Sequence, residues 1–120
     1  MAKGMSEQTY LVMLALADEP RHGYGVVREV KALSDGRVTL GAGTLYGVLD
    51  RLVERGWALM SDEVVVDGRL RRYYRLTDDG LAEVTAETDR LRDLATRARR
   101  ILAVTPARPA RSARPALGGA

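Results

Sequence analysis

Residues 57–76 read WALMSDEVVVDGRLRRYYRL, a segment whose pattern differs from the helical spacing on either side of it. Its first ten residues are rich in strand-forming side chains, and Asp67-Gly68 is a strong signal for a tight turn. A second run of strand formers follows from Arg69 to Leu76. The stretch therefore predicts a β-hairpin with its tip at Asp67-Gly68.

Apolar residues recur at helical spacing on both sides of this hairpin. Before it, the spacing predicts three helices, at about residues 6–18, 22–34 and 42–55. Ser6 is a good N-cap for the first helix, which must end before Pro20, and Gly56 closes the third. After the hairpin, Thr77 is a good N-cap for a fourth helix that continues to about Val104.

Three helices followed by a two-stranded hairpin form a winged helix-turn-helix, in which the later helix enters the major groove of DNA. We therefore predict a mainly α fold with a small β-hairpin and a long C-terminal helix. The expected domains are a winged helix-turn-helix DNA-binding domain at 5–77, a C-terminal dimerisation helix at 78–104 and a disordered Arg/Pro/Ala tail at 105–120.

The composition of the 120-residue chain excludes several classes of protein. It has no Cys and one His, which excludes a disulfide framework, a thiolate zinc site and a histidine-rich metal site. No carboxylate and nucleophile accompany His22 in a catalytic pattern, so we expect it to act locally at the start of the second helix. We therefore expect no enzyme, no metal and no other cofactor.

No apolar run approaches the roughly 18–20 residues that span a bilayer. The expected protein is therefore soluble and cytoplasmic, with no membrane partner.

Charge is distributed unevenly along the chain. The 19 Lys+Arg and 16 Asp+Glu residues give a net charge of +3. Three arginines in the tail carry all of it, which leaves 16 basic and 16 acidic residues in 1–104. Within this neutral body, arginines cluster at 69–75 and at 90–100, a pattern that fits a polyanionic partner. The tail either adds phosphate attraction or is an inert solubilising end.

Arginines of the hairpin and the third helix are the candidate contacts. Strand alternation places Arg69 and Arg71 on one face and Arg72 on the other. They would contact phosphates or the minor groove, or else protect a solvated edge strand from aggregation. Arg51 would contact a guanine or a phosphate, or else pair with an acid; the candidate acids are Asp50, Glu54 and Glu7.

The aromatic residues near the hairpin have a packing role in this interpretation. Tyr73, Tyr74 and Leu76 pack or terminate the hairpin, and Trp57 begins its first strand and packs it against the third helix.

The fourth helix carries an apolar seam with alternating steps of three and four residues, which is typical of a helix that packs against another helix. Its members are Leu81, Val84, Thr88, Leu91, Ala95, Ala98 and Leu102, and Leu94 and Ile101 widen it. The seam is longer than one small domain needs, so it predicts a homodimer; the alternative is a helix that covers only its own domain. A homodimer would match a palindromic operator with half-sites ~34 Å apart.

Several motifs over residues 8–85 occur in the order and spacing of one family. They are His22-Gly23-Tyr24, Gly43-Thr44-Leu45-Tyr46, Leu49-Asp50-Arg51-Leu52-Val53-Glu54-Arg55-Gly56, Gly68-Arg69, Arg72-Tyr73-Tyr74-Arg75-Leu76-Thr77 and Gly80. In these the chain resembles the PadR family of bacterial transcriptional regulators, in its small subgroup with a single C-terminal dimerisation helix. It departs from the family at Gly41-Ala42, where Ser-Pro is frequent, and at Gly47, where proline is common.

The resemblance implies a DNA-binding repressor that works as a homodimer and is released from double-stranded DNA by a small-molecule effector. It puts Thr44 and Tyr46 at DNA-contacting positions, with Gly43 and Gly47 permitting close approach to the backbone. For Tyr46, partial packing into the core is the alternative. For the whole chain, the alternative is a winged-helix protein–protein interaction module without DNA binding, because residues 1–104 carry no net charge.

Overall fold

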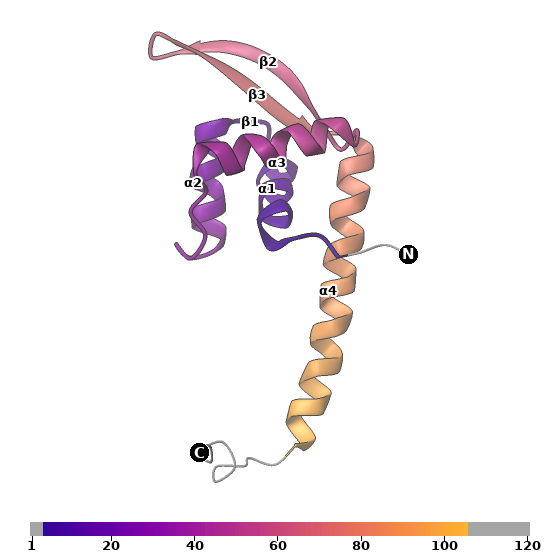
Figure 1. The fold of residues 1–120 in the computed structure, drawn as a ribbon. Helices are drawn as coiled ribbons and strands as arrows, with labels where there is room; N and C mark the ends of the chain where they lie inside the picture. The colour runs from indigo at the N-terminus through magenta and orange to yellow at the C-terminus, as the bar shows by residue number, and fades with distance from the viewer. Residues whose placement is uncertain (1–3, 106–120) are drawn as a thin grey trace. The chain divides into compact units, whose positions relative to one another are not determined.

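A computed structural model describes residues 4–105 of the chain. Figure 1 shows the described elements in chain order. They are α1 (Glu7–Asp18), β1 (Arg21–His22), α2 (Gly23–Leu33), α3 (Ala42–Glu54), β2 (Ala58–Val66), β3 (Arg69–Leu76) and α4 (Asp78–Val104). The predicted fold class, a mainly α winged helix-turn-helix with a long C-terminal helix, is confirmed. The predicted tail lies outside the described residues, apart from Thr105.

Local signals in the sequence fix the ends of α1 and α2. The Ser6 hydroxyl oxygen accepts a hydrogen bond from the Thr9 backbone N–H at 3.1 Å, which caps α1. The helix ends at Asp18, just before Pro20. His22 caps α2, because its Nδ1 accepts from the Gly25 N–H at 3.1 Å. The local role predicted for the single histidine is therefore confirmed.

The predicted hairpin is present, but it is part of a three-stranded antiparallel sheet in the order β1-β3-β2. Asp67 and Gly68 form its turn with φ of 52° and 77°. This left-handed backbone is the one that a two-residue hairpin requires. The additional strand β1 pairs Arg21 with Tyr74 and His22 with Tyr73. A strand of two residues has no periodicity to detect, so the pattern analysis missed it.

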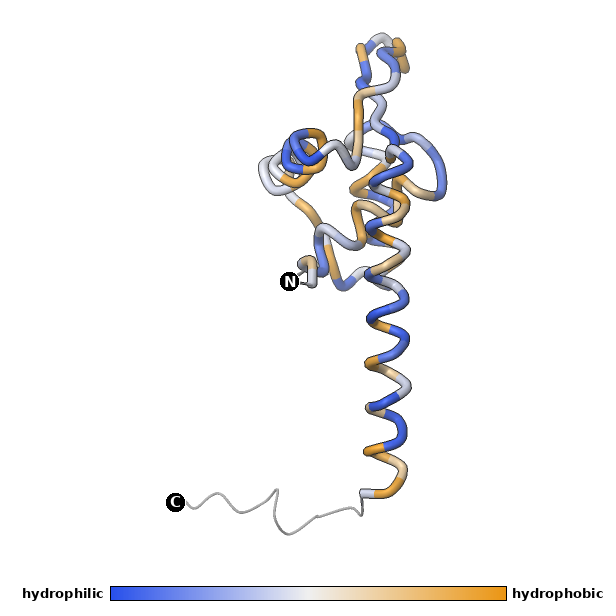
Figure 2. The backbone as a smooth tube through the Cα atoms, turned by 90° about the vertical axis from the view of Figure 1, so that its right-hand side faces the viewer, coloured by the Kyte–Doolittle hydropathy of each residue, from blue (hydrophilic) through white to orange (hydrophobic). Residues whose placement is uncertain are grey.

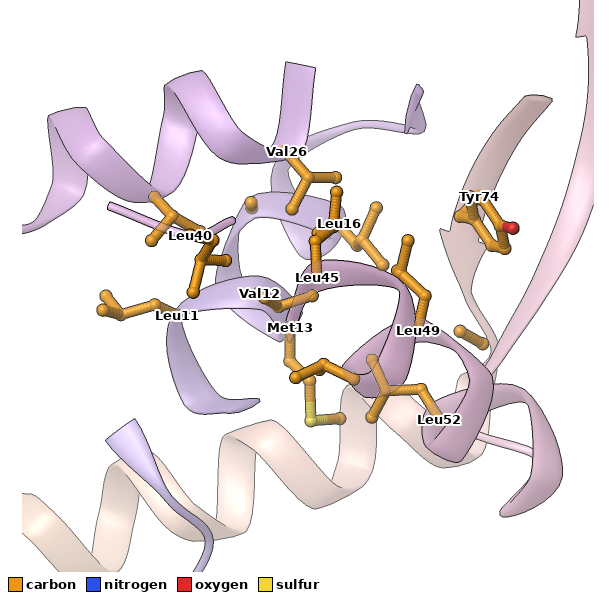
Figure 3. Packing of buried hydrophobic residues seen from close by; sticks show 14 of the residues in the cluster. Leu11, Val12, Met13, Leu16, Val26, Leu40, Leu45, Leu49, Leu52 and Tyr74 are labelled. Carbon is orange, nitrogen blue, oxygen red and sulfur yellow. The ribbon is translucent and has the colours of Figure 1, made fainter. Parts of the chain in front are cut away.

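The hydrophobic core lies between the three short helices and the base of the sheet (Figure 3). Val12 and Met13 of α1, Val26 and Val30 of α2, and a stripe on α3 are at most 2% exposed. Ala58 of β2 and Tyr74 of β3 close the core from the sheet. These buried residues recur at helical spacing, so each of the three helices turns one apolar face to the core.

Trp57 joins the end of α3 to the sheet and to α4. It is half-buried against the core and precedes β2, which begins one residue later than predicted. Its N–H donates to the Leu52 carbonyl oxygen at 2.9 Å, and its own carbonyl oxygen accepts from the Thr77 N–H at 3.0 Å. The guanidinium of Arg55 lies 5.1 Å from the centre of its ring.

Thr77 caps α4 as predicted. Its hydroxyl accepts from the Gly80 N–H at 3.0 Å and donates to the Gly56 carbonyl oxygen at 2.6 Å. Gly80 is buried, and a Cβ there would overlap the backbone carbonyl of Trp57. Close packing of backbone on backbone thus fixes the first turn of α4.

The described chain divides into two structural units between Thr88 and Asp89. The first contains the winged helix and the beginning of α4, where the Tyr10 and Thr88 hydroxyls are 2.6 Å apart. The described part of the second consists of the remainder of α4 and Thr105. In Figure 2, hydrophobic and hydrophilic residues alternate along this part of the helix.

Candidate nucleic-acid interface

The two faces of α3 have different environments. Leu45, Val48, Leu49 and Leu52 are at most 2% exposed and fix the helix on the core. The opposite face is open to solvent. It carries most of the helix residues predicted to contact DNA, namely Gly43, Thr44, Tyr46 and Arg51, with Gly47 half-buried at its edge. The structure therefore brings these predicted residues together on one surface.

Two glycines leave space on this surface. A Cβ on Gly43 would meet no atom of the chain within 4 Å, and one on Gly47 would meet only the Arg51 Nη1, at 3.7 Å. Internal packing therefore does not require glycine at either position. Bare backbone at the start of a helix allows another molecule to approach closely.

Tyr46 is partly exposed and partly packed against α2. Its side chain is 45% exposed. Its hydroxyl oxygen also lies against α2, since a Cβ on Gly23 would come within 2.5 Å of it. Burial raises the pKa of Tyr74, and the neighbouring Tyr46 and Asp50 raise it further. Tyr46 thus packs against α2 while part of the residue remains exposed.

Arg51 is free of the ion pairs considered for it. Within residues 4–105, Arg51 forms no ion pair with any of the three candidate acids, Asp50, Glu54 and Glu7. Glu7 is instead bound by Arg37, which lowers the pKa of the Glu7 carboxyl through a hydrogen bond. The Arg51 guanidinium is therefore available to an external anion.

The hairpin, which we call the wing, carries the three arginines predicted to contact DNA. They differ in ion pairing and in exposure. The Arg72 Nε lies 3.3 Å from the Glu63 carboxylate across the two strands. Arg69 and Arg71 form no ion pair with any described residue. Arg71 is half-buried, whereas Arg69 and Arg72 are exposed. Arg69 and Arg71 thus retain uncompensated charge.

The wing also has an apolar tip that the sequence analysis did not single out. Val65 and Leu70 form a cross-strand pair and are 67% and 61% exposed. The alternation of the strands would have revealed them, because both occupy the face that Tyr74 uses in the core.

The residues predicted for dimerisation differ in how exposed they are. Val84 is 3% exposed and belongs to the core of its own chain, so it is not available to a partner. Leu81 is half exposed, and Ala98 is half-buried. The others are exposed on the part of α4 beyond Thr88, and they are Leu91, Leu94, Ala95, Ile101 and Leu102.

Two further observations concern other classes of site. Within residues 4–105, no group of three or more His, Cys, Asp or Glu side chains is arranged to hold a metal ion. No helix in the described range has the length and apolarity needed to cross a membrane.

The three short helices followed by the wing define a winged helix-turn-helix protein. Solved structures share this fold: smu.1704 from Streptococcus mutans superposes with a TM-score of 0.70 at 22% identity, over 90% of this chain and 99% of that chain. A PadR family transcriptional regulator from Eggerthella lenta is 31% identical, with a TM-score of 0.62 over 79% of this chain and 83% of that one.

The chain belongs to the transcriptional regulator PadR-like family, which residues 12–86 match. The transcriptional regulator Rv3488 of Mycobacterium tuberculosis is 42% identical over 79 residues, which cover 66% of this chain and 70% of that protein. The family resemblance expected from the motifs is thereby confirmed, and the chain is a PadR-like transcriptional regulator.

Proposed function

We propose that this regulator represses transcription by binding promoter DNA as a homodimer. In this proposal α3 enters the major groove with Thr44 and Tyr46 at base edges, and Arg51 contacts a base or a phosphate. The wing arginines contact the flanking backbone. The observation that carries the proposal is that Arg51 on the exposed face of α3 and Arg69 and Arg71 on the wing have no acidic partner among residues 4–105.

The homodimer rests on the apolar residues of α4 between Leu91 and Val104. Their larger side chains are 37–80% exposed, which is unusual for so many apolar groups on one helix. Their heptad spacing suits a second copy of the same helix, with Ala95 and Ala98 allowing close approach. The domains at 5–77 and 78–104 would then serve DNA binding and dimerisation, respectively. A small molecule that changes this dimer would release the DNA.

The test begins with selection of bound fragments from sheared genomic DNA, followed by affinity measurements on the enriched sequence. Enrichment of a pseudo-palindrome with half-sites ~34 Å apart is expected. If two protomers neutralise ~8–10 phosphates, log K should fall with log salt with a slope of roughly −7 to −9. Absence of binding at low salt would contradict the proposal and favour a protein partner, for which the apolar wing tip is the candidate surface.

Variants separate the roles of the two surfaces. Arg69→Gln should weaken binding to all sequences alike, whereas Thr44→Ala should change the preferred sequence. Lys31→Gln is the matched control, because it removes one positive charge from the exposed end of α2. Leu94→Asp combined with Ile101→Asp should give a monomer in analytical ultracentrifugation.

A further inference from the structure

A pocket of about 380 Å³ lies in the first unit between the beginning of α2 and the tip of the wing. Figure 1 shows this end of α2, next to β1, with the wing arching above it. The α2 side contributes His22, Tyr24 and Arg28, and the wing contributes Arg71 and Tyr73. Its volume is within the range of small-molecule sites.

Two of the arginines that line the pocket carry uncompensated charge. Arg21 is occupied by Asp18 at 2.7 Å, Glu29 at 3.6 Å and Glu19 at 3.7 Å. Arg28 and Arg71, by contrast, form no ion pair with any residue in the described range. The Arg71 Nε is buried and has no hydrogen-bond partner within that range. A buried donor without a partner is rare in folded proteins and calls for an acceptor.

His22 provides a further donor at the same place. Its Nδ1 accepts the Gly25 N–H, so the neutral imidazole carries its proton on Nε2. Burial lowers the pKa of His22, and the charges of Arg71 and Arg28 lower it further. At neutral pH the ring is therefore uncharged and offers an Nε2–H to an acceptor.

Aromatic rings lie next to these donors. The His22 ring meets the Tyr73 ring edge-on at 5.2 Å and is stacked with the Tyr24 ring at 6.5 Å. The Arg28 guanidinium lies 5.8 Å from the centre of the Tyr24 ring. Of the two acids lining the pocket, Glu19 contacts Arg21, and Asp67 lies in the turn of the wing.

We propose that this pocket binds an oxyanion, namely the phosphoryl group of the DNA backbone beside the wing or of a small phosphorylated molecule. Arg71 and Arg28 would supply the charge and the guanidinium donors, and the His22 Nε2–H would donate a further hydrogen bond. Such charge-assisted donors are the strong ligands of phosphate in proteins. Only the assignment to the DNA backbone rests on the proposed function; the oxyanion site does not depend on it.

Because the chain contains a single histidine, the imidazole resonances of His22 report on this pocket without ambiguity. Titration of the full chain with pyrophosphate at pH 7.5, against sodium chloride of equal ionic strength, should give a saturable shift of these resonances. Arg28→Gln and Arg71→Gln should weaken the apparent affinity at least tenfold, and Lys31→Gln should leave it unchanged. Arg71→Lys keeps the charge but removes the planar guanidinium with its paired donors, so it should also weaken binding.

Shifts that do not saturate, or that are equal in all variants, would overturn the proposal. Amide spectra of each variant show whether it is folded. A second titration, in the presence of the selected duplex, identifies the source of the phosphate. If the duplex abolishes pyrophosphate binding by the wild-type chain, and Arg28→Gln binds the duplex three- to tenfold more weakly, the phosphate is that of the DNA backbone. If the wild-type chain still binds pyrophosphate in the presence of the duplex, and Arg28→Gln binds the duplex as tightly as wild type, the ligand of the pocket is a small phosphorylated molecule. The first titration is read without DNA, so a failure of the proposed DNA binding cannot mask its result.

Discussion

The two parts of α4 share one apolar period, but they differ in how deeply their residues are buried. In the part up to Thr88, Gly80 and Val84 are buried in the first unit. In the part from Asp89 to Val104, Ala98 is half-buried and every other residue is exposed, including four leucine or isoleucine side chains at 37–71%. A heptad seam therefore shows that a helix has a packing face, but it does not show which partner each turn packs against.

The largest effect is expected at the buried end of the helix. Gly80→Ala would force a Cβ into the Trp57 carbonyl and should cost about 3 kcal/mol of unfolding free energy, because neither backbone can move freely. Thermal unfolding should show a fall in Tm of more than 10 °C. Gly43→Ala is the control, since its Cβ meets no atom within 4 Å. Equal midpoints for the two variants would mean that the start of α4 is not tightly packed.

The second prediction contrasts one apolar residue from each part of α4. Val84→Ala should cost about 2 kcal/mol at any protein concentration, because the side chain is part of the core. Leu94→Ala should leave the unfolding of the monomer within ~0.5 kcal/mol of wild type and should weaken the dimer. Urea unfolding at two protein concentrations measures both. A cost for Leu94→Ala that is the same at both concentrations would place its side chain inside its own chain.

A smaller effect is expected at the cap that joins the wing to α4. Thr77→Ala removes the acceptor for the Gly80 N–H and the donor to the Gly56 carbonyl oxygen. Loss of such a cap costs ~1 kcal/mol, which urea unfolding detects. Thr77→Ser keeps the hydroxyl and should restore most of the loss. If Thr77→Ser is as unstable as Thr77→Ala, the methyl group rather than the hydroxyl is responsible.

The smallest effect concerns pH and the start of α2. Burial and the nearby Arg71 and Arg28 hold the pKa of His22 below its ordinary value of 6.5. The unfolded chain therefore binds this proton more readily, and the free energy of unfolding should decrease as pH falls through 6.5 and level off below the folded-state pKa. The midpoints of urea unfolding at pH 7.5 and 5.5 measure this decrease in stability. His22→Asn retains a capping side chain and should show a smaller decrease; an equal decrease would assign the pH dependence to other groups.

Much of the fold could be predicted because its signals are local. Ser6, Pro20, Gly56 and Thr77 fixed the ends of helices through caps and backbone restrictions that act within a few residues. Asp67-Gly68 fixed the hairpin turn in the same way. The pairing of β1 with β3 could not be predicted, since it depends on residues that meet only when the core has formed.

The candidate site could be predicted less completely. The family motifs drew attention to Thr44 and Tyr46, which are exposed on α3, and strand alternation separated Arg69 and Arg71 from Arg72. Whether an arginine is free depends on the tertiary position of each acid: Glu7 binds Arg37 rather than Arg51, and Glu63 binds Arg72. The pocket between the wing and α2 joins segments distant in the sequence, so no local pattern indicates it.

The short strand β1 has a consequence for the order in which the domain folds. Helices form in ~0.1–1 μs and hairpins in ~1–10 μs, because their contacts are local. The pairing of Arg21 with Tyr74 instead closes a long loop of chain, which slows folding. We therefore expect the β1–β3 ladder to form after the helices and the hairpin. This short strand would then complete the sheet only once α2 and the hairpin have come together.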